Sequence, residues 1–151
     1  MLTTNRKGTL AEAKIAAAAV EAGVGVARPL GDERYDLIFD LGERLLRVQC
    51  KWATREDGVV VARLYTCRRG PDGLISRRYR PGEFEAFGLY CPANDRCYLL
   101  PADEFVAHRV VTLRLAPSRN NQQLGIRWAQ DYELTVTLGR LLGPIAQLGE
   151  R

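Results

Sequence analysis

The chain has 151 residues, of which 46% are hydrophobic and 26% charged, so it can bury one domain core and is too apolar for wholesale disorder. No apolar run approaches the roughly 20 residues of a membrane span and no secretory signal opens the chain, so we expect a cytoplasmic protein without a membrane partner. The formal net charge of +4 favours an acidic partner such as nucleic acid.

The first part of the chain is predicted to form a helix followed by strands. Residues 8–22 are typical of a helix, with Thr9 as the N-cap, Glu12 three residues later and Gly23 as the stop. Runs rich in Val, Ile, Leu and aromatic residues, separated by turn residues, predict strands. These predicted strands cover residues 24–27, 35–41, 44–52 and 59–67.

The remaining elements are predicted to be mixed. Residues 68–82 combine five arginines with Gly and Pro turns, which predicts a loop or ribbon that protrudes from the domain. Further strands are predicted over 86–91, 97–100 and 110–115, with a short helix near 101–105 and a helical turn over 126–132. This order of elements predicts an α/β (α+β) domain built on one sheet.

The strands over 35–41 and 44–52 are predicted to pair as a hairpin whose turn is centred on residues 41 and 42. Residues whose numbers sum to 83 then lie opposite each other and share a face. One face is apolar and is expected to contact the core; it holds Tyr35, Leu37, Phe39, Leu46, Val48, Cys50 and Trp52. The other face brings Asp36 together with Arg47, Gln49 and Lys51. A three-residue loop would reverse these sides.

The second face offers the groups that phosphodiester hydrolysis requires. A divalent ion neutralises the phosphate and activates water, and a cation positions the nucleophile. Asp36 is a hard oxygen ligand suited to Mg²⁺, and the side-chain carbonyl of Gln49 and the backbone carbonyl of Cys50 are candidate second and third ligands. Lys51 can hold the attacking water or the phosphate. Glu12 adds a carboxylate if its helix packs on the sheet. The spacing alone fits equally well a solvated hairpin face with an incidental Asp–Arg pair.

A longer stretch of sequence favours the first interpretation. The run GTLAEAKIAAAAVEAGVGVARPLGDERYDLIFDLGERLLRVQCKWA resembles the PD-(D/E)XK endonucleases, in the branch associated with group I intron homing endonucleases. That branch carries Gln in a strand of the form V-Q-x-K, found here as Val48-Gln49-Cys50-Lys51. The resemblance continues through FGLYCPANDRCYLLP and RNNQQLGIRWAQDYEL and covers about residues 6–134.

The resemblance implies a central mixed β-sheet flanked by helices and Mg²⁺- or Mn²⁺-dependent double-strand cleavage of a specific DNA site. It implies Glu12 as the acidic residue of the helix, Asp36 as the metal-binding aspartate and Lys51 as the catalytic lysine. Gln49 stands at a position that is usually acidic, which leaves the number of metal ions open. Tyr35 replaces the proline of the family's name motif.

Two polar segments are candidates for contact with double-stranded DNA, because Arg and amide side chains bond phosphates and base edges. The first comprises Arg68, Arg69, Arg77, Arg78, Tyr79 and Arg80; the second comprises Asn120, Asn121 and Gln122. A solvated basic loop and a turn rich in capping residues are the alternatives for these segments.

The nuclease domain is predicted to span residues 1–134, with 135–151 as a C-terminal tail. The last residues, GPIAQLGER, resemble a translated tRNA gene, which suggests a reading frame that runs into such a gene. Cutting both strands needs two active sites, so we expect a homo-oligomer, either a dimer or a tetramer. A Holliday-junction or other structure-selective nuclease and a catalytically silent DNA-binding module are the rival functions.

Overall fold

The structure is a computed structural model that describes residues 1–117 and 125–142. Its centre is a five-stranded sheet in the order β1-β2-β3-β8-β9. β3 and β8 are parallel and the other neighbours antiparallel, so the sheet is mixed, as expected. The strands are β1 (Gly25–Ala27), β2 (Leu37–Asp40), β3 (Leu45–Trp52), β8 (Ala86–Cys91) and β9 (Arg96–Pro101).

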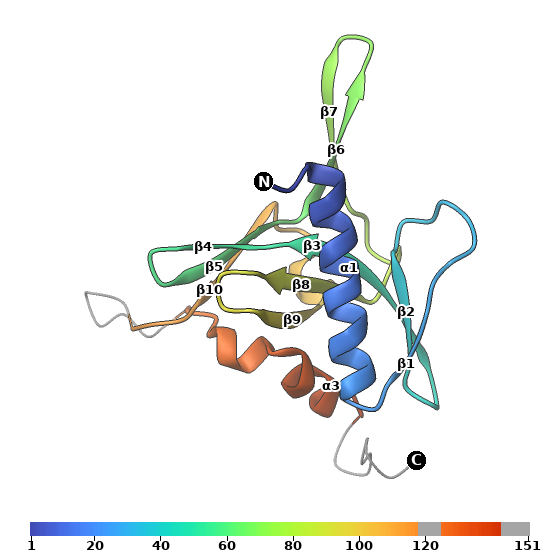
Figure 1. Cartoon of the computed structure of the whole chain (residues 1–151), viewed down its shortest axis with the longest axis vertical. Helices are drawn as coiled ribbons and strands as arrows, with labels where there is room; N and C mark the ends of the chain where they lie inside the picture. Colours follow the sequence, from blue (N-terminus) through green and yellow to red (C-terminus); the bar gives the residue numbers. More distant parts are fainter. Residues whose placement is uncertain (118–124, 143–151) are drawn as a thin grey trace.

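Helix α1 (Thr4–Glu21) packs across one face of this sheet, beside α3 (Leu134–Leu142) (Figure 1). Its buried stripe consists of Ala11, Ile15 and Ala19, spaced four residues apart along one side of the helix. Gly88 of β8 allows the close approach, because an added Cβ there would lie 3.1 Å from Ile15 Cγ2. The sheet therefore fixes where α1, and the Glu12 that it carries, lie.

The opposite face of the sheet is covered by a second core cluster. This cluster includes Phe87 and Leu89 of β8 and side chains from a three-stranded sheet ordered β10-β5-β4. The elements on this side are β4 (Thr54–Glu56), β5 (Val59–Arg63), α2 (Ala102–Phe105), β10 (Val110–Arg114) and the 3-10 helix η1 (Ala129–Tyr132). The mixed sheet is thus buried on both faces, which leaves its ends and edges for functional groups.

Strands β6 (Tyr65–Gly70) and β7 (Gly73–Arg78) form a separate hairpin that projects from one end of the molecule (Figure 1). The basic segment 68–82 was expected to be a loop or ribbon, and most of it forms this ribbon. The expected strand over 59–67 is divided between β5 and β6, with buried Leu64 at the division. The described residues form three sheets instead of the single sheet expected.

Both ends of the domain differ from the prediction. Helix α1 begins at Thr4, because Thr3 Oγ1 accepts the N–H of Arg6 at 3.2 Å, and the expected cap Thr9 lies inside the helix. Residues 135–142, expected to be tail, lie in α3, where Leu138 is buried and Thr137 donates a hydrogen bond to Leu99 O at 2.7 Å. Helix α3 therefore packs against the sheet, and residues 143–151, with the tRNA-like segment, lie outside the described part.

The structure confirms the expected fold class, a mixed α+β domain with a central mixed sheet and flanking helices. Within the described residues, none of the helices is both long and apolar enough to cross a membrane.

Candidate active site

The β2–β3 hairpin carries most of the predicted site, and its register differs from the prediction by two residues. Leu37 pairs with Val48, so opposite residues sum to 85. The turn lies at residues 42 and 43, where the Asp40 carboxylate accepts the N–H of Gly42 at 2.8 Å and Gly42 has a φ of 94°. Because the turn still contains two residues, the side-chain parity is unchanged and both faces keep their predicted members within the strands.

The apolar face packs as predicted, except at its first residue. Leu37, Phe39, Leu46 and Val48 are all buried beneath α1 and α3. Tyr35 precedes β2 and packs against the opposite cluster, where Arg47 Cζ lies 5.7 Å from its ring centroid. Its placement on the apolar face was therefore wrong, because the alternation of a strand does not extend to residues outside that strand.

Asp36 stands at the start of β2, facing β3. Its backbone N–H donates to Val48 O at 2.9 Å, and its carboxylate Oδ2 accepts the backbone N–H of Cys50 at 2.8 Å. In a strand the N–H and C=O of one residue point to the same edge. The Cys50 carbonyl therefore points toward the edge where the Asp36 carboxylate lies. A carboxylate and a peptide oxygen are thus brought to one place.

Two acidic side chains, Asp36 and Glu12, influence each other electrostatically here. Burial raises the pKa of Asp36, and the hydrogen bond from Cys50 and the charges of Lys51 and Arg28 oppose this rise. Burial likewise raises the pKa of Glu12, and repulsion from Asp36 adds to the effect. Arg28, in the segment between β1 and β2, bonds Glu12 at 3.2 Å. The helix and the hairpin therefore place Glu12 within range of the charge of Asp36, which adds to the rise in its pKa.

Lys51 lies on the face of β3 that was predicted for it. Its Nζ donates to the carbonyl of Tyr65 at 3.1 Å and lies 4.9 Å from the centroid of the Tyr79 ring. Gln49 is two residues away on the same face and is partly buried. The foot of the β6–β7 hairpin thus holds the lysine whose charge opposes the rise in the pKa of Asp36.

The donor set fits a divalent cation with oxygen ligands. Among the described residues no group of three or more His, Cys, Asp and Glu side chains forms a metal cluster. The candidate ligands at this edge include groups other than these side chains. They are two carboxylates, those of Asp36 and Glu12, and two neutral donors, the Cys50 carbonyl and the Gln49 amide. Burial is the main cause of the raised pKa of both carboxylates, and a nearby positive charge would favour their ionised forms.

The predicted DNA-contacting residues are distributed unevenly. Arg78 and Arg80 are exposed at the foot of the hairpin, and Arg77 is partly exposed and paired with Glu83 at 3.4 Å. Tyr79 is only 4% exposed and packs edge-on against two phenylalanines, so it is a core residue and not part of a DNA-facing surface. Arg68 and Arg69 lie in β6, but their side chains, like residues 120–122, fall outside the described structure.

Sequence reasoning missed several charged residues around the site. Arg28 and Arg34 come from the segment before β2, and Glu83 and Glu85 from the segment before β8. Arg34 bonds Glu83 across 49 positions of sequence, and Arg47 bonds Glu85 across 38. Partners so far apart in sequence form no local pattern, so the sequence does not show that they pair.

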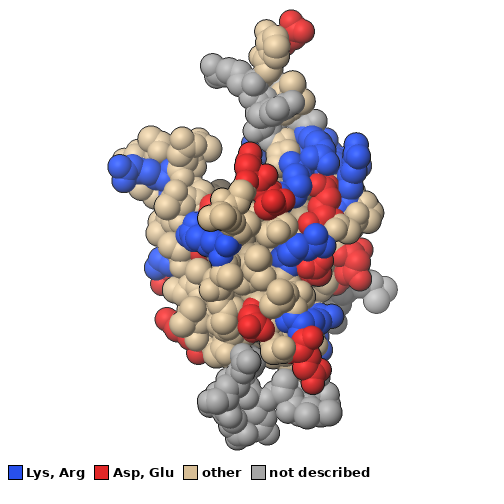
Figure 2. Space-filling model, turned by 90° about the vertical axis from the view of Figure 1, so that its right-hand side faces the viewer, with Lys and Arg blue, Asp and Glu red and all other residues tan. Residues whose placement is uncertain are grey.

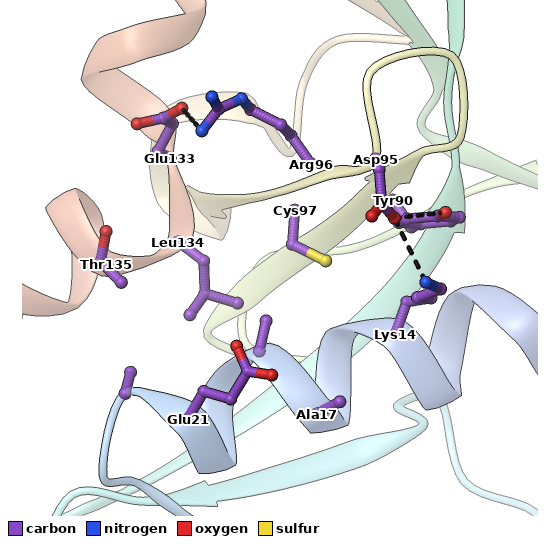
Figure 3. A pocket seen from close by; sticks show the side chains of 12 residues that line it. Lys14, Ala17, Glu21, Tyr90, Asp95, Arg96, Cys97, Glu133, Leu134 and Thr135 are labelled. Carbon is purple, nitrogen blue, oxygen red and sulfur yellow. Dashed lines mark hydrogen bonds and ion pairs between the residues drawn. The ribbon is translucent and has the colours of Figure 1, made fainter.

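A hollow on the α1 side of the molecule is separate from this site (Figure 3). It lies between α1, the β8–β9 turn and α3, where Lys14 bonds Asp95 at 3.2 Å and Tyr90 donates to the same carboxylate at 2.8 Å. None of the predicted catalytic residues lines it. Lys14, Tyr90 and Asp95 are paired with one another there, which is typical of a surface network.

Comparisons with known proteins agree with the geometry. A family model described as PD-(D/E)XK endonuclease matches residues 2–135. Among solved structures, the bacterial homing endonuclease I-Ssp6803I is similar with a TM-score of 0.73 and 26% sequence identity, covering 93% of this chain and 97% of that one. No curated protein matches.

Proposed function

The chain belongs to the PD-(D/E)XK endonuclease family, and from this premise we propose that it is a homing-type endonuclease that makes double-strand breaks at a specific DNA site. The observation that carries the proposal is the contact of the Asp36 carboxylate with the Cys50 N–H, beside Glu12 and Lys51. A solved structure that is similar over nearly the whole chain is described as a homing endonuclease. This likeness favours cleavage of a specific site in linear DNA over cleavage of branched DNA.

The residues divide the work according to their chemistry. Asp36 and the Cys50 carbonyl would hold a magnesium or manganese ion, with Glu12 and Gln49 as further oxygen donors. Such an ion would supply positive charge that neutralises the phosphate and activates water for attack. Lys51 donates hydrogen bonds to the scissile phosphate or the attacking water, and its ammonium is held in place by Tyr65 O.

A double-strand break needs two such sites on opposite strands, so the proposal includes a homo-oligomer with at least two subunits. The β6–β7 hairpin, with arginines at its foot, would enter a groove of the same DNA. Lys51 contacts Tyr65 and Tyr79, so it lies at the base of this hairpin.

The direct test is to incubate the full chain with Mg²⁺ and linear DNA from its genomic neighbourhood and to map the ends produced. We expect discrete double-strand cuts that EDTA abolishes. Cleavage of a four-way junction in preference to the linear duplex would favour a structure-selective nuclease. DNA binding without cleavage in either metal would favour a silent binding module.

A further inference from the structure

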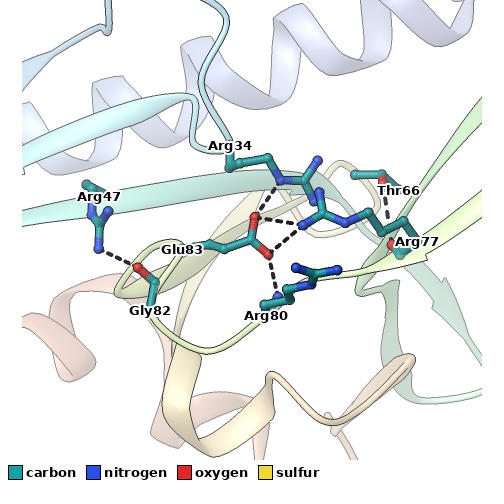
Figure 4. Close-up of polar contacts among 7 residues, drawn as sticks. All are labelled: Arg34, Arg47, Thr66, Arg77, Arg80, Gly82 and Glu83. Carbon is teal, nitrogen blue, oxygen red and sulfur yellow. Dashed lines mark hydrogen bonds and ion pairs between the residues drawn. The ribbon is translucent and has the colours of Figure 1, made fainter.

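Glu83 gathers three arginines at the foot of the β6–β7 hairpin (Figure 4). Its carboxylate accepts Arg34 Nε at 2.7 Å, Arg77 Nη2 at 3.4 Å and the backbone N–H of Arg80. These arginines come from the segment before β2, from β7 and from the segment after β7. We refer to Arg34, Arg77, Arg80 and Glu83 as the Glu83 cluster. Two guanidinium groups, those of Arg34 and Arg77, face one carboxylate, so the cluster carries a net positive charge.

The Glu83 cluster adjoins the candidate active site through one aromatic ring. Arg34 Cζ lies 4.9 Å from the centroid of the Tyr79 ring, and Lys51 Nζ lies 4.9 Å from the same centroid. Arg34 also precedes Asp36 by only two residues. Phosphates along one DNA strand recur every ~3.4 Å of helix axis, so two cations that share a ring can contact nearby phosphates of one strand.

The Arg34 side chain is partly exposed, and the described part of the protein does not satisfy all of its hydrogen-bond donors. Among the described residues, Arg34 Nη2 and the Tyr79 hydroxyl are buried without a hydrogen-bond partner. They are two of four such atoms in the residues that the structure describes, and unpaired buried groups are rare in native structures. The Arg34 side chain as a whole is 36% exposed and that of Arg77 is 41% exposed, so both reach the surface. Seen from the side of β1 and β2, basic atoms gather with acidic ones below the projecting hairpin (Figure 2).

We propose that the Glu83 cluster is a binding site for DNA phosphates that seats the backbone beside Asp36 and Lys51. The proposal rests on the proposed endonuclease function and adds Arg34 and Glu83 to it. The planar fork of a guanidinium bonds two phosphate oxygens at once, which fixes the strand's position as well as attracting it. Glu83 holds the guanidinium groups of Arg34 and Arg77 at one place before DNA arrives.

The test measures binding without metal, with a fluorescein-labelled duplex of arbitrary sequence in EDTA over a range of salt. Arg34→Ala is compared with Arg96→Ala, which also removes one arginine bonded to one glutamate but lies in β9 at the far edge of the sheet. Losing one phosphate contact should reduce the slope of log K against log salt by about 0.9. We expect this for Arg34→Ala only; equal slopes for the two variants would overturn the proposal.

Arg34→Lys provides a second variant if the alanine variant unfolds. Lysine keeps the charge but lacks the fork, so the salt slope should remain that of the wild type while affinity falls several-fold. Wild-type affinity in Arg34→Lys would contradict the bidentate contact. The outcomes for binding and cleavage are separable: an unchanged slope in Arg34→Ala with active wild-type enzyme rejects only the phosphate site. A reduced slope with no cleavage under Mg²⁺ rejects the nuclease and retains the site.

Discussion

The carboxylate of Asp36 accepts the backbone N–H of Cys50 at 2.8 Å, so a side chain at the start of β2 is tied to the middle of β3. This bond turns the Asp36 carboxylate toward the edge to which the Cys50 carbonyl points. The same strand presents Lys51 one residue later, on the face that contacts the hairpin foot. The candidate site is therefore built by strand pairing, and its geometry depends on the register of β2 and β3.

Asp36→Asn should stabilise the protein while abolishing cleavage. Burial raises the pKa of Asp36, so its contribution to stability is present below the ordinary value of 3.8 and is lost as pH rises through the raised pKa. At neutral pH a neutral amide avoids burying that charge, and gains of this kind are of the order of 1 kcal/mol. Thermal unfolding at pH 7 and at pH 3.5 measures the effect. A variant that melts below the wild type at pH 7 would contradict it.

The same substitution should remove stabilisation by metal. A cation that binds only the folded chain stabilises it by RT ln(1 + L/Kd), where L is the concentration of the free cation, and so raises the melting temperature. We expect Mg²⁺ to raise the melting temperature of the wild type and to leave that of Asp36→Asn unchanged. Equal Mg²⁺ shifts in both proteins would place the metal elsewhere.

Gln49→Glu should tighten Mg²⁺ binding. The substitution adds a carboxylate on the face of β3 that carries Lys51, at the position where the family usually has an acid, and charged ligands raise affinity for hard cations. An increase of roughly tenfold is expected in a calorimetric titration. Gln130→Glu adds the same charge at an exposed position of η1 and serves as the control. Equal affinities in the two variants would exclude Gln49 from the metal site.

Gly88→Ala should destabilise the protein by disturbing the packing of α1 on the sheet. An added Cβ would lie 3.1 Å from Ile15 Cγ2 and from Val48 Cγ1, both in the buried core, and overpacking of this kind costs about 1–3 kcal/mol. Gly139→Ala in α3 is the matched control. Its new Cβ meets nothing within 4 Å, so better helix propensity should stabilise the chain by about 1 kcal/mol. Chemical denaturation of both variants measures these changes; similar effects in the two would contradict the tight packing at Gly88.

The parity of the β2–β3 hairpin could be predicted from sequence because side chains alternate with a period of two, and any two-residue turn preserves that alternation. The exact register could not, since Leu41-Gly42 and Gly42-Glu43 are both plausible turns. The bond from Gly42 N–H to Asp40 selects the second. The β4–β5 hairpin was missed, although Asp57-Gly58, which adopts positive φ angles, is a local signal for such a turn.

The charged surroundings of the site were beyond sequence reasoning for a different reason. Arg34 and Glu83 are joined by the folded chain and not by any short-range pattern. The basic segment correctly indicated a ribbon, but Tyr79 was assigned to its surface because neighbouring residues are arginines. Its ring instead fills the core between Phe84 and Phe87, which only the tertiary packing determines.

The most direct measurement compares cleavage and binding in Lys51→Ala, with Lys14→Ala as the control that removes a lysine on the other side of the molecule. If the Lys51 ammonium and the Asp36 carboxylate act on one phosphate, single-turnover cleavage of the mapped target under Mg²⁺ should fall at least about a hundredfold. DNA affinity should fall far less than the cleavage rate, and Lys14→Ala should cut normally. Lys51→Ala that cleaves as fast as Lys14→Ala would contradict the shared site.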